Sequence, residues 1–371
     1  MAKNTRILTF VSRFMGHSVA GLESQIFEEY SKISNIHPLI IITEEATSSK
    51  DNVTLIQIPK ISIPKIRGIN KILQYVFATI KLRKKYDLVY VRTFSIPELV
   101  SSYFSKKFLK KPLILLVPGS WILINNRIQT KILRYFFKKN LHLADKIIFY
   151  SRLMIPEIKS IIGNFDESRS IIIHNAVDPQ KFFPNQSLTK QNKILYVGRI
   201  HPLKNIHDIV NAIPLVKKKI PDIQLELIGF IESENYLNLL KQKISTLNCQ
   251  NNIQLLGPIP HNNIQKYYDD CSIFVLMGQN EGMPRSILEA MSSGKAVISA
   301  PNSGIPDLIK NNINGILVEN NNPEKLSENI IKLLTDVELR KKIGFEARKT
   351  IEENFTWELF INNITNEFKK F

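Results

Sequence analysis

Short apolar runs bounded by turn residues recur along the chain, as is typical of strands buried in a parallel sheet. Such runs lie at residues 6–11, 87–92 and 112–117 in the first half, and they resume at residues 193–197 in the second half. Segments with the helical spacing of apolar residues alternate with them or follow them, as at residues 323–335. The alternation predicts an α/β protein in which parallel sheets are wrapped by helices.

The most informative segment begins with an apolar run at residues 272–277, which predicts a buried strand. A turn follows, and we expect Pro284 at the first position of a helix, where its missing N–H has no partner to lose. Gly294 is expected to end that helix. Glu281 then lies in the loop ahead of the helix, and Glu289 lies roughly 7.5 Å along the axis from Pro284.

Two carboxylates on either side of a helix start suit a ligand that carries both phosphate and hydroxyl groups. The free N–H groups of the first helical turn favour an anion. One acid can accept hydrogen bonds from ribose hydroxyls, and the other can accept them from sugar hydroxyls. The segment therefore predicts a site for a nucleoside diphosphate that is joined to a sugar.

This strand, loop and helix resemble the family-4 retaining glycosyltransferases of the GT-B fold. The resemblance rests on the two glutamates eight positions apart, on Ala290 and Met291, and on Gly-Lys-Ala-Val-Ile at residues 294–298. It is dense from about residue 171 to residue 357 and sparse before that. The first half matches in the order of its elements rather than in its identities.

The resemblance implies two Rossmann-like parallel-sheet domains that face a central cleft. The acceptor-side domain is predicted at residues 1–180, with residues 144–151 as its last strand. The nucleotide-sugar-binding domain is predicted at residues 185–352. Residues 353–371 are expected to form a terminal helix that packs back toward the first domain.

The resemblance also implies contacts to the donor. Arg199 and Lys204 follow the strand at residues 193–197, and their permanent charges would neutralise the diphosphate as the glycosyl bond breaks. Glu281 would orient the donor sugar and Glu289 the ribose, so that Glu281, Arg199 and Lys204 are the catalytic candidates. The donor-binding positions implied by the resemblance are Gly21, Gly198, Gly282, Met283, Pro284 and Glu289.

The chain departs from the family pattern at several positions. Many family members have a histidine that contacts the donor sugar where Pro118 stands here, so no catalytic histidine is assigned. Gly119 and Ser120 could contact the sugar or the acceptor from this place. Gly278 replaces a serine that is common in the family, which removes a hydroxyl contact. The scattered histidines that could serve instead are His17, His142 and His174, although isolated histidines are more often structural.

The mechanism that the resemblance implies is front-face retention, in which the departing phosphate accepts the proton of the acceptor. No cofactor and no divalent metal are expected, because an arginine and a lysine neutralise the phosphates and no Asp-X-Asp stands in a fitting place.

The formal charge of +17 is concentrated in the first half of the chain. Residues 1–170 contain 27 Lys and Arg against 12 Asp and Glu, whereas residues 171–371 contain 23 against 21. A basic half suggests an anionic partner, such as a membrane surface, a lipid-linked phosphate acceptor or nucleic acid. Clusters at residues 106–111 and 131–139 mix bases with large apolar residues, as interfacial helices do, so we predict an anionic membrane surface and no nucleic acid.

The two cysteines, Cys249 and Cys271, lie far apart and lack metal-ligand spacing, which fits a reducing compartment. No apolar run approaches the roughly 18 residues of a membrane span. The N-terminus lacks the apolar segment of a signal peptide. A cytoplasmic location is therefore expected, peripheral on the inner face of the cytoplasmic membrane.

The predicted function is transfer of a sugar, with retention, from a nucleoside diphosphate sugar to a glycan or lipid-linked acceptor in cell-envelope polysaccharide synthesis. A nucleotide-sugar epimerase on the same fold is one alternative, and turnover of the donor without an acceptor would favour it. A non-catalytic subunit that binds a nucleotide sugar is the other alternative, and tight donor binding without transfer would favour that.

Overall fold

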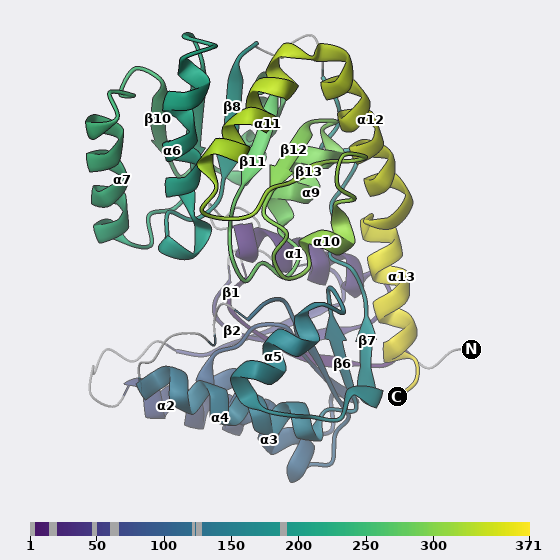
Figure 1. Ribbon diagram of the computed structural model, residues 1–371. Helices are drawn as coiled ribbons and strands as arrows, with labels where there is room; N and C mark the ends of the chain where they lie inside the picture. Colours follow the sequence, from purple (N-terminus) through teal and green to yellow (C-terminus); the bar gives the residue numbers. More distant parts are fainter. Residues whose placement is uncertain are drawn as a thin grey trace. The chain divides into compact units, whose positions relative to one another are not determined.

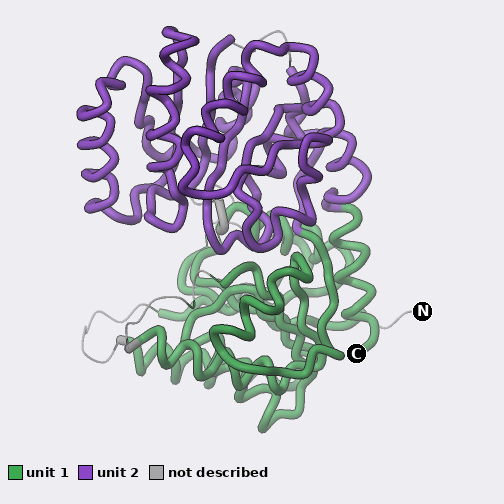
Figure 2. Tube along the Cα trace, in the orientation of Figure 1, with its two compact units in different colours: residues 1–174, 358–371 green, residues 175–357 purple. Residues whose placement is uncertain are grey.

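The computed structural model describes residues 4–14, 21–46, 50–59, 67–120, 123, 128–185 and 191–371. The chain forms two compact units (Figure 2), of which unit 1 comprises residues 1–174 and 358–371 and unit 2 comprises residues 175–357. The sequence prediction places its boundaries a few residues away, at 180 and 353. The chain passes between the units after residue 174 and again after residue 357. Next to these two places, Val177 N donates to the Phe355 carbonyl at 2.9 Å, within unit 2.

Unit 1 is built on a parallel sheet whose described strands run in the order β3-β2-β1-β4-β5-β6-β7. The strands are β1 (Ile7–Phe14), β2 (Leu39–Ala46), β3 (Val53–Gln57), β4 (Leu88–Val91), β5 (Leu113–Val117), β6 (Lys146–Phe149) and β7 (Ser170–Ile172). The inner strands β4 and β5 are buried along their whole length, which is why they read as continuous apolar runs in the sequence.

Strand β7 shows that one prediction was wrong. Residues 144–151 do not form the last strand of the first sheet, because β7 pairs in parallel with β6 and places Ser170 opposite Ile147. β7 has only three residues, and all of them are of intermediate exposure. A strand this short leaves little periodicity to read in the sequence.

The helices of unit 1 cover both faces of the sheet. They are α1 (Gly21–Ser34), α2 (Arg67–Lys81), α3 (Ile96–Lys107), α4 (Ile128–Leu143), α5 (Met154–Ile162) and α13 (Trp357–Phe368). Helices α2, α3 and α4 pack side by side in one layer (Figure 1). The C-terminal helix α13 is fixed to the sheet at its end, where the ring of Phe368 lies 5.3 Å from that of Tyr90.

A buried ion pair joins helix α1 to Arg92, the residue that follows strand β4 of unit 1. Arg92 Nη1 lies 3.0 Å from Glu29 Oε2, and both side chains are fully buried. Tyr90 donates its hydroxyl to the other oxygen of Glu29 at 2.7 Å, and Arg92 donates to the Tyr150 hydroxyl at 3.1 Å. Burial raises the pKa of Glu29 although the charge of Arg92 opposes that rise. Each charged group therefore depends on the other to remain inside the core.

Unit 2 is built on a second parallel sheet, with its described strands in the order β10-β9-β8-β11-β12-β13. The strands are β8 (Lys193–Val197), β9 (Gln224–Ile228), β10 (Ile253–Gly257), β11 (Ile273–Leu276), β12 (Ala296–Ser299) and β13 (Ile316–Leu317). The helices are α6 (Ile206–Lys217), α7 (Glu234–Thr246), α8 (Gln265–Asp270), α9 (Arg285–Ser292), α10 (Ile305–Leu308), α11 (Pro323–Thr335) and α12 (Val337–Asn354). In the described part of the chain, no helix is both long and apolar enough to cross a membrane.

The Glu29–Arg92 pair gives the first testable prediction. Arg92→Ala leaves the Glu29 carboxylate buried without its counter-charge, so the free energy of unfolding should fall by about 3–5 kcal/mol. Denaturant unfolding followed by circular dichroism measures this loss. The matched control is Arg6→Ala, which breaks the exposed 2.8 Å pair with Asp87 and should cost at most about 1 kcal/mol. Equal losses in the two variants would contradict this account of the core.

Candidate donor site

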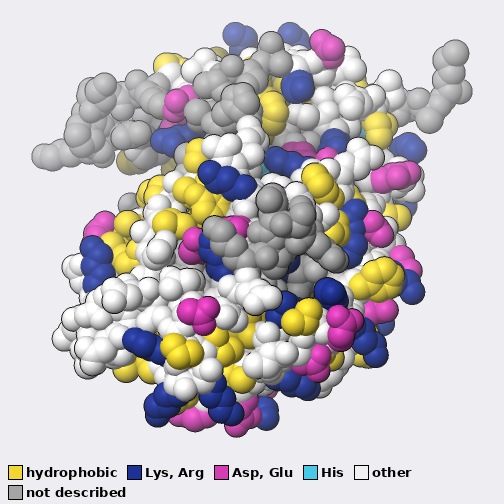
Figure 3. Space-filling view, turned by 90° about the horizontal axis from the view of Figure 1, so that it is seen from above, with side chains coloured by type: hydrophobic (Ala, Val, Ile, Leu, Met, Phe, Trp, Pro, Cys, Tyr) yellow, Lys and Arg dark blue, Asp and Glu magenta, His cyan; other side chains and the backbone are white. Residues whose placement is uncertain are grey.

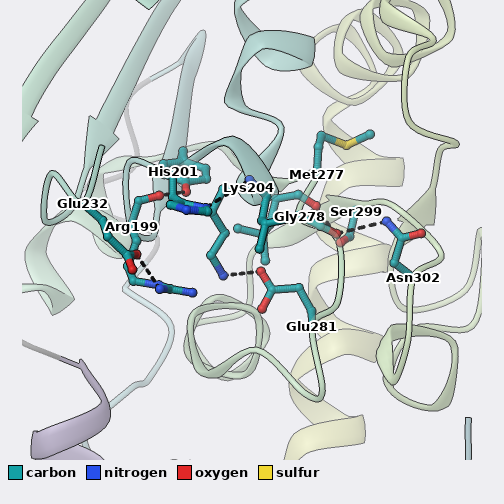
Figure 4. A network of polar contacts seen from close by, with 12 residues as sticks. Arg199, His201, Lys204, Glu232, Met277, Gly278, Glu281, Ser299 and Asn302 are labelled. Carbon is teal, nitrogen blue, oxygen red and sulfur yellow. Dashed lines mark hydrogen bonds and ion pairs between the residues drawn. The ribbon is translucent and has the colours of Figure 1, made fainter. Parts of the chain in front are cut away.

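Three loops at the carboxyl edge of the unit 2 sheet carry most of the predicted donor residues. They follow β8, β9 and β11, which are neighbours in the sheet. Because the carboxyl ends of parallel strands lie at the same edge, residues that are distant in sequence meet there (Figure 4). Arg199 and Lys204 come from the first loop, Glu232 from the second and Glu281 from the third.

At Gly198 the backbone of the first loop closely approaches the backbone of the second loop at Gly229. A Cβ atom at Gly229 would overlap the carbonyl oxygen of Gly198. A Cβ atom at Gly198 would lie 2.6 Å from the hydroxyl of Tyr196, which itself donates to the Arg199 carbonyl at 2.8 Å. The close backbone approach therefore needs a glycine at 229, and at Gly198 a side chain would displace the Tyr196 hydroxyl that supports Arg199. The sequence singles out Gly198 but not Gly229.

Arg199 extends from this turn and forms an ion pair with Glu232 (Figure 4). The pair is fixed by the backbone, because the Ile200 amide donates to the Phe230 carbonyl at 2.8 Å and the Glu232 amide donates back to the Ile200 carbonyl at 3.3 Å. The side chain of Arg199 is 31% exposed, so its guanidinium remains accessible to a second anion. Sequence reasoning missed Glu232.

Lys204 stands at the end of a short 3-10 helix, η4 (Pro202–Lys204). The imidazole of His201 caps that helix by accepting a hydrogen bond from the Leu203 amide at 3.2 Å. Burial lowers the pKa of His201, which favours the neutral ring that this acceptor role needs. From there the ammonium of Lys204 reaches across and forms an ion pair with Glu281 Oε1 (Figure 4).

The third loop is shaped around Glu281. A Cβ atom at Gly278 would overlap the Glu281 carboxylate, so the glycine makes room for that side chain. This gives a physical reason for the glycine that the sequence shows only as a missing serine hydroxyl. The Gln279 amide donates to the Leu203 carbonyl at 2.7 Å and ties this loop to the Lys204 loop.

Three polar side chains brace the same loop from strand β12 and the segments beyond it. Asn302 donates to the Gly278 carbonyl at 3.0 Å (Figure 4). Ser299 donates to the Leu276 carbonyl at 2.7 Å, and Asn320 donates to the Met277 carbonyl at 2.7 Å. The sequence offers no motif for this bracing, because serine and asparagine after a strand are also ordinary turn residues.

Helix α9 begins one residue later than predicted, and the prediction that Pro284 occupies its first position was wrong. Pro284 is the N-cap, with an extended ψ of 125°, and Arg285 is the first helical residue. Asn175 holds the preceding turn by donating to the Met283 carbonyl at 2.9 Å. Within the described residues, the amides of Gly282 and Met283 donate no hydrogen bond, so they remain available to an anion.

Glu289 lies inside α9, only 3% exposed, and has three partners. Its carboxylate lies 2.7 Å from His261 Nε2, 2.9 Å from the Tyr268 hydroxyl and 2.8 Å from Arg285 Nε. Burial alone would raise the pKa of Glu289, but interactions with His261, Arg285 and Tyr268 outweigh it and lower that pKa. The sequence identified Glu289 but none of these partners.

Two family models match the chain. One, described as Glycosyltransferase Family 4, covers residues 32–181, and the other, described as Glycosyl transferases group 1, covers residues 177–350. Together they extend over most of both units. The chain therefore belongs to the glycosyltransferases that these two models describe.

Relatives and solved structures agree with this assignment. An uncharacterized glycosyltransferase of Methanocaldococcus jannaschii is 29% identical over 86% of this chain and 85% of its own. The capsular polysaccharide biosynthesis glycosyltransferase CapM of Staphylococcus aureus is 27% identical over 62% of this chain and 65% of its own. HepE of Anabaena, solved in complex with UDP-glucose, superposes with a TM-score of 0.81 at 16% identity, over 99% of this chain and 100% of that one. The glycosyltransferase therefore has the GT-B fold, with two parallel-sheet α/β domains.

The remaining predicted positions of the glycosyltransferase belong to unit 1. Gly21 is the first residue of α1, and Gly119 and Ser120 follow β5. The buried hydroxyl of Ser120 donates to Glu157, so it is already engaged within unit 1. Of the histidines, His174 contacts the Tyr150 carbonyl through Nδ1 at 2.8 Å, and His17 lies outside the described residues.

The backbone approach at Gly198 gives the second prediction. In the glycosyltransferase, Gly229→Ala should reduce the free energy of unfolding by at least about 2–3 kcal/mol, because backbone must move to admit the new methyl group. Thermal unfolding measures the loss. Gly68→Ala is the control, since nothing lies within 4 Å of a Cβ atom at that position of α2 and alanine should be neutral or slightly stabilising there. Unchanged stability in Gly229→Ala would disprove the close approach.

Proposed function

We propose that this glycosyltransferase transfers a sugar from a nucleoside diphosphate sugar, with retention of configuration, to a glycan or lipid-linked acceptor in cell-envelope polysaccharide or glycolipid synthesis. The observation that carries the proposal is the convergence of Arg199, Lys204 and Glu281 ahead of helix α9 (Figure 4). Two cations and a carboxylate at one sheet edge match a ligand that is anionic at its diphosphate and hydroxylated at its sugar.

The diphosphate is assigned to the cations. Arg199 presents a planar fork and Lys204 a point charge, and both are supported by carboxylates that keep them in place. The amides of Gly282 and Met283 and the start of α9 beyond Pro284 add partial positive charge. Together these groups stabilise the negative charge that develops on the departing phosphate.

The sugar and the ribose are assigned to the two glutamates. Glu281 carries the ion pair with Lys204 on Oε1, which leaves Oε2 to accept hydrogen bonds from sugar hydroxyls. An ionised carboxylate offers about four acceptor sites. His261 and Tyr268 occupy two of those on Glu289, and Arg285 adds an ion pair, which leaves room for a ribose hydroxyl.

Two comparisons support this choice of substrates. HepE, which shares the fold, was solved with UDP-glucose, and CapM is named for capsular polysaccharide biosynthesis. The proposed mechanism is front-face retention, in which the departing phosphate takes the proton of the acceptor hydroxyl while Arg199 and Lys204 hold it. Because these charges neutralise the diphosphate, the reaction is proposed to run without a divalent metal.

The acceptor side is assigned to unit 1. Its excess of lysine and arginine favours an anionic partner, and we include an anionic membrane surface, at the inner face of the cytoplasmic membrane, among the partners of the enzyme. Gly119 and Ser120 remain the proposed contacts to sugar or acceptor in this unit.

The donor assignment is tested by thermal unfolding with a panel of nucleoside diphosphate sugars. At 100 times its dissociation constant, the correct donor should stabilise the wild type by about 2.7 kcal/mol. Arg199→Ala and Lys204→Ala each remove a charge-assisted contact worth about 1.5–3 kcal/mol and should abolish most of the shift. The control Lys241→Ala, on the exposed face of α7, should keep the full shift. Shifts that survive in the Arg199 and Lys204 variants would refute the assignment.

The reaction itself is tested with the donor so identified and an envelope lipid and glycan extract as acceptor. NMR of the product should show the anomeric configuration of the donor, and turnover should persist in excess EDTA. An inverted product would overturn the front-face mechanism. Turnover that stops in EDTA and returns with Mg²⁺ would overturn the metal-free assignment.

A further inference from the structure

Helix α2 of unit 1 is apolar on two faces, and only one of them is covered. Its inner face packs into the core through Tyr75 and Thr79, which are fully buried. Its outer face presents Ile69, Leu73 and Phe77, which are 65%, 63% and 66% exposed. A contiguous apolar face that stays exposed marks an interaction site, so the outer face of α2 calls for a partner.

The three residues form a continuous stripe. They are spaced four positions apart, so they lie one above the other along about 12 Å of the helix. Half-exposed apolar residues at the neighbouring helical positions widen the stripe, namely Ile72, Val76 and Ile80. We call Ile69, Leu73 and Phe77 the α2 stripe.

The layer that contains the stripe is strongly basic. Helices α2, α3 and α4 pack side by side (Figure 1), and together with the loops that follow α2 and α3 they comprise residues 67–86, 96–111 and 128–143. These residues include 14 Lys and Arg and a single acid, Glu98, which is fully buried. On the face of the chain seen in Figure 3, by contrast, basic and acidic side chains lie interspersed.

Further apolar and aromatic side chains of the layer are paired with its cations. Phe108 and Tyr135 are each more than half exposed. Lys107 lies 5.5 Å from the ring centre of Phe108, and Lys139 lies 5.4 Å from that of Tyr135. Amphipathic groups of this kind, with an apolar body beside a cation, are typical of surfaces that sit at a lipid headgroup boundary.

From these observations we propose that the α2 stripe inserts into an anionic lipid surface, while the basic residues of the same layer contact the headgroups. The proposal rests on the proposed function, since it specifies how the acceptor-side unit meets the membrane. A second copy of the chain is the poorer partner, because two such faces would bring like charges together. The carboxylates that border the layer, Glu44 and Asp145, are already paired with its own Lys71 and Lys106 and cannot compensate. A lipid surface offers both the apolar interior and the negative charge.

The test uses the purified full chain and vesicles of phosphatidylcholine with 30% phosphatidylglycerol, at low and at high salt. Salt screens the basic contacts but not the apolar ones. The wild type should therefore bind more weakly at high salt without losing binding completely. Phe77→Ser and, separately, Leu73→Ser should each weaken binding about tenfold at both salt concentrations, because each removes most of one inserted side chain.

The matched control is Phe345→Ser, at a phenylalanine of unit 2 that is 67% exposed and lies outside this layer. It should bind vesicles like the wild type. Far-ultraviolet circular dichroism and melting temperature confirm that the variants fold. Sedimentation without lipid should give the same mass for Phe77→Ser and the wild type.

Vesicle binding by both stripe variants at the wild-type strength would overturn the proposal, and so would a wild type that ignores the vesicles. A loss of mass in Phe77→Ser would overturn it in favour of contact between copies of the chain. A failure of the proposed donor site can be told apart from a failure of the membrane proposal. Stabilisation by a nucleoside diphosphate sugar is measured without lipid and depends on Arg199 and Lys204. That stabilisation should be unchanged in both stripe variants.

Discussion

The proposed donor site depends on the contacts that join the loops after β8 and β11. The Gln279 amide bonds to the Leu203 carbonyl, and the Lys204 ammonium pairs with Glu281, so backbone and side chain make the same connection. The connection places the cation that we propose for phosphate beside the carboxylate that we propose for sugar hydroxyls. Lys204 and Glu281, which we propose as catalytic residues, thus also hold the two loops together. Their side chains are therefore positioned before a ligand binds.

Around these contacts, carboxylates and cations are arranged in pairs of graded exposure. Arg199 and Glu232 are about one-third exposed, Lys204 and Glu281 are nearly buried, and Glu289 is buried among three partners. The exposed pair can exchange its anion at little cost, whereas a buried carboxylate must keep its partners. This gradient suits a site that binds phosphate at its open side and recognises hydroxyls deeper inside.

The sequence predicts the architecture well where the physical signal is strong. Buried parallel strands such as β4 and β5 read as apolar runs, and the fold class follows from their alternation with helices. The prediction fails where the signal is short or conformational. Strand β7 has three residues, and the first residue of α9 depends on a ψ angle at Pro284 that no pattern specifies. The paired glutamates and the Arg–Lys spacing were visible because they form a motif.

Their partners were not visible, because Glu232, His261 and Tyr268 are brought to the site only by the order of the strands. Gly229 was missed for a similar reason, since its role is a steric one against Gly198 on the neighbouring loop. The exposure of the α2 stripe was not predicted from the sequence either. An apolar helix in the sequence does not tell which of its faces the fold leaves uncovered.

The central claim is that the leaving diphosphate is held at the carboxyl edge of the unit 2 sheet. It is tested most directly by a crystal structure of the chain with the nucleoside diphosphate that stabilises it most. The account predicts phosphate oxygens within hydrogen-bond distance of Arg199, Lys204 and the amides of Gly282 and Met283. A diphosphate bound elsewhere, with Arg199 and Lys204 still paired only to their glutamates, would contradict it.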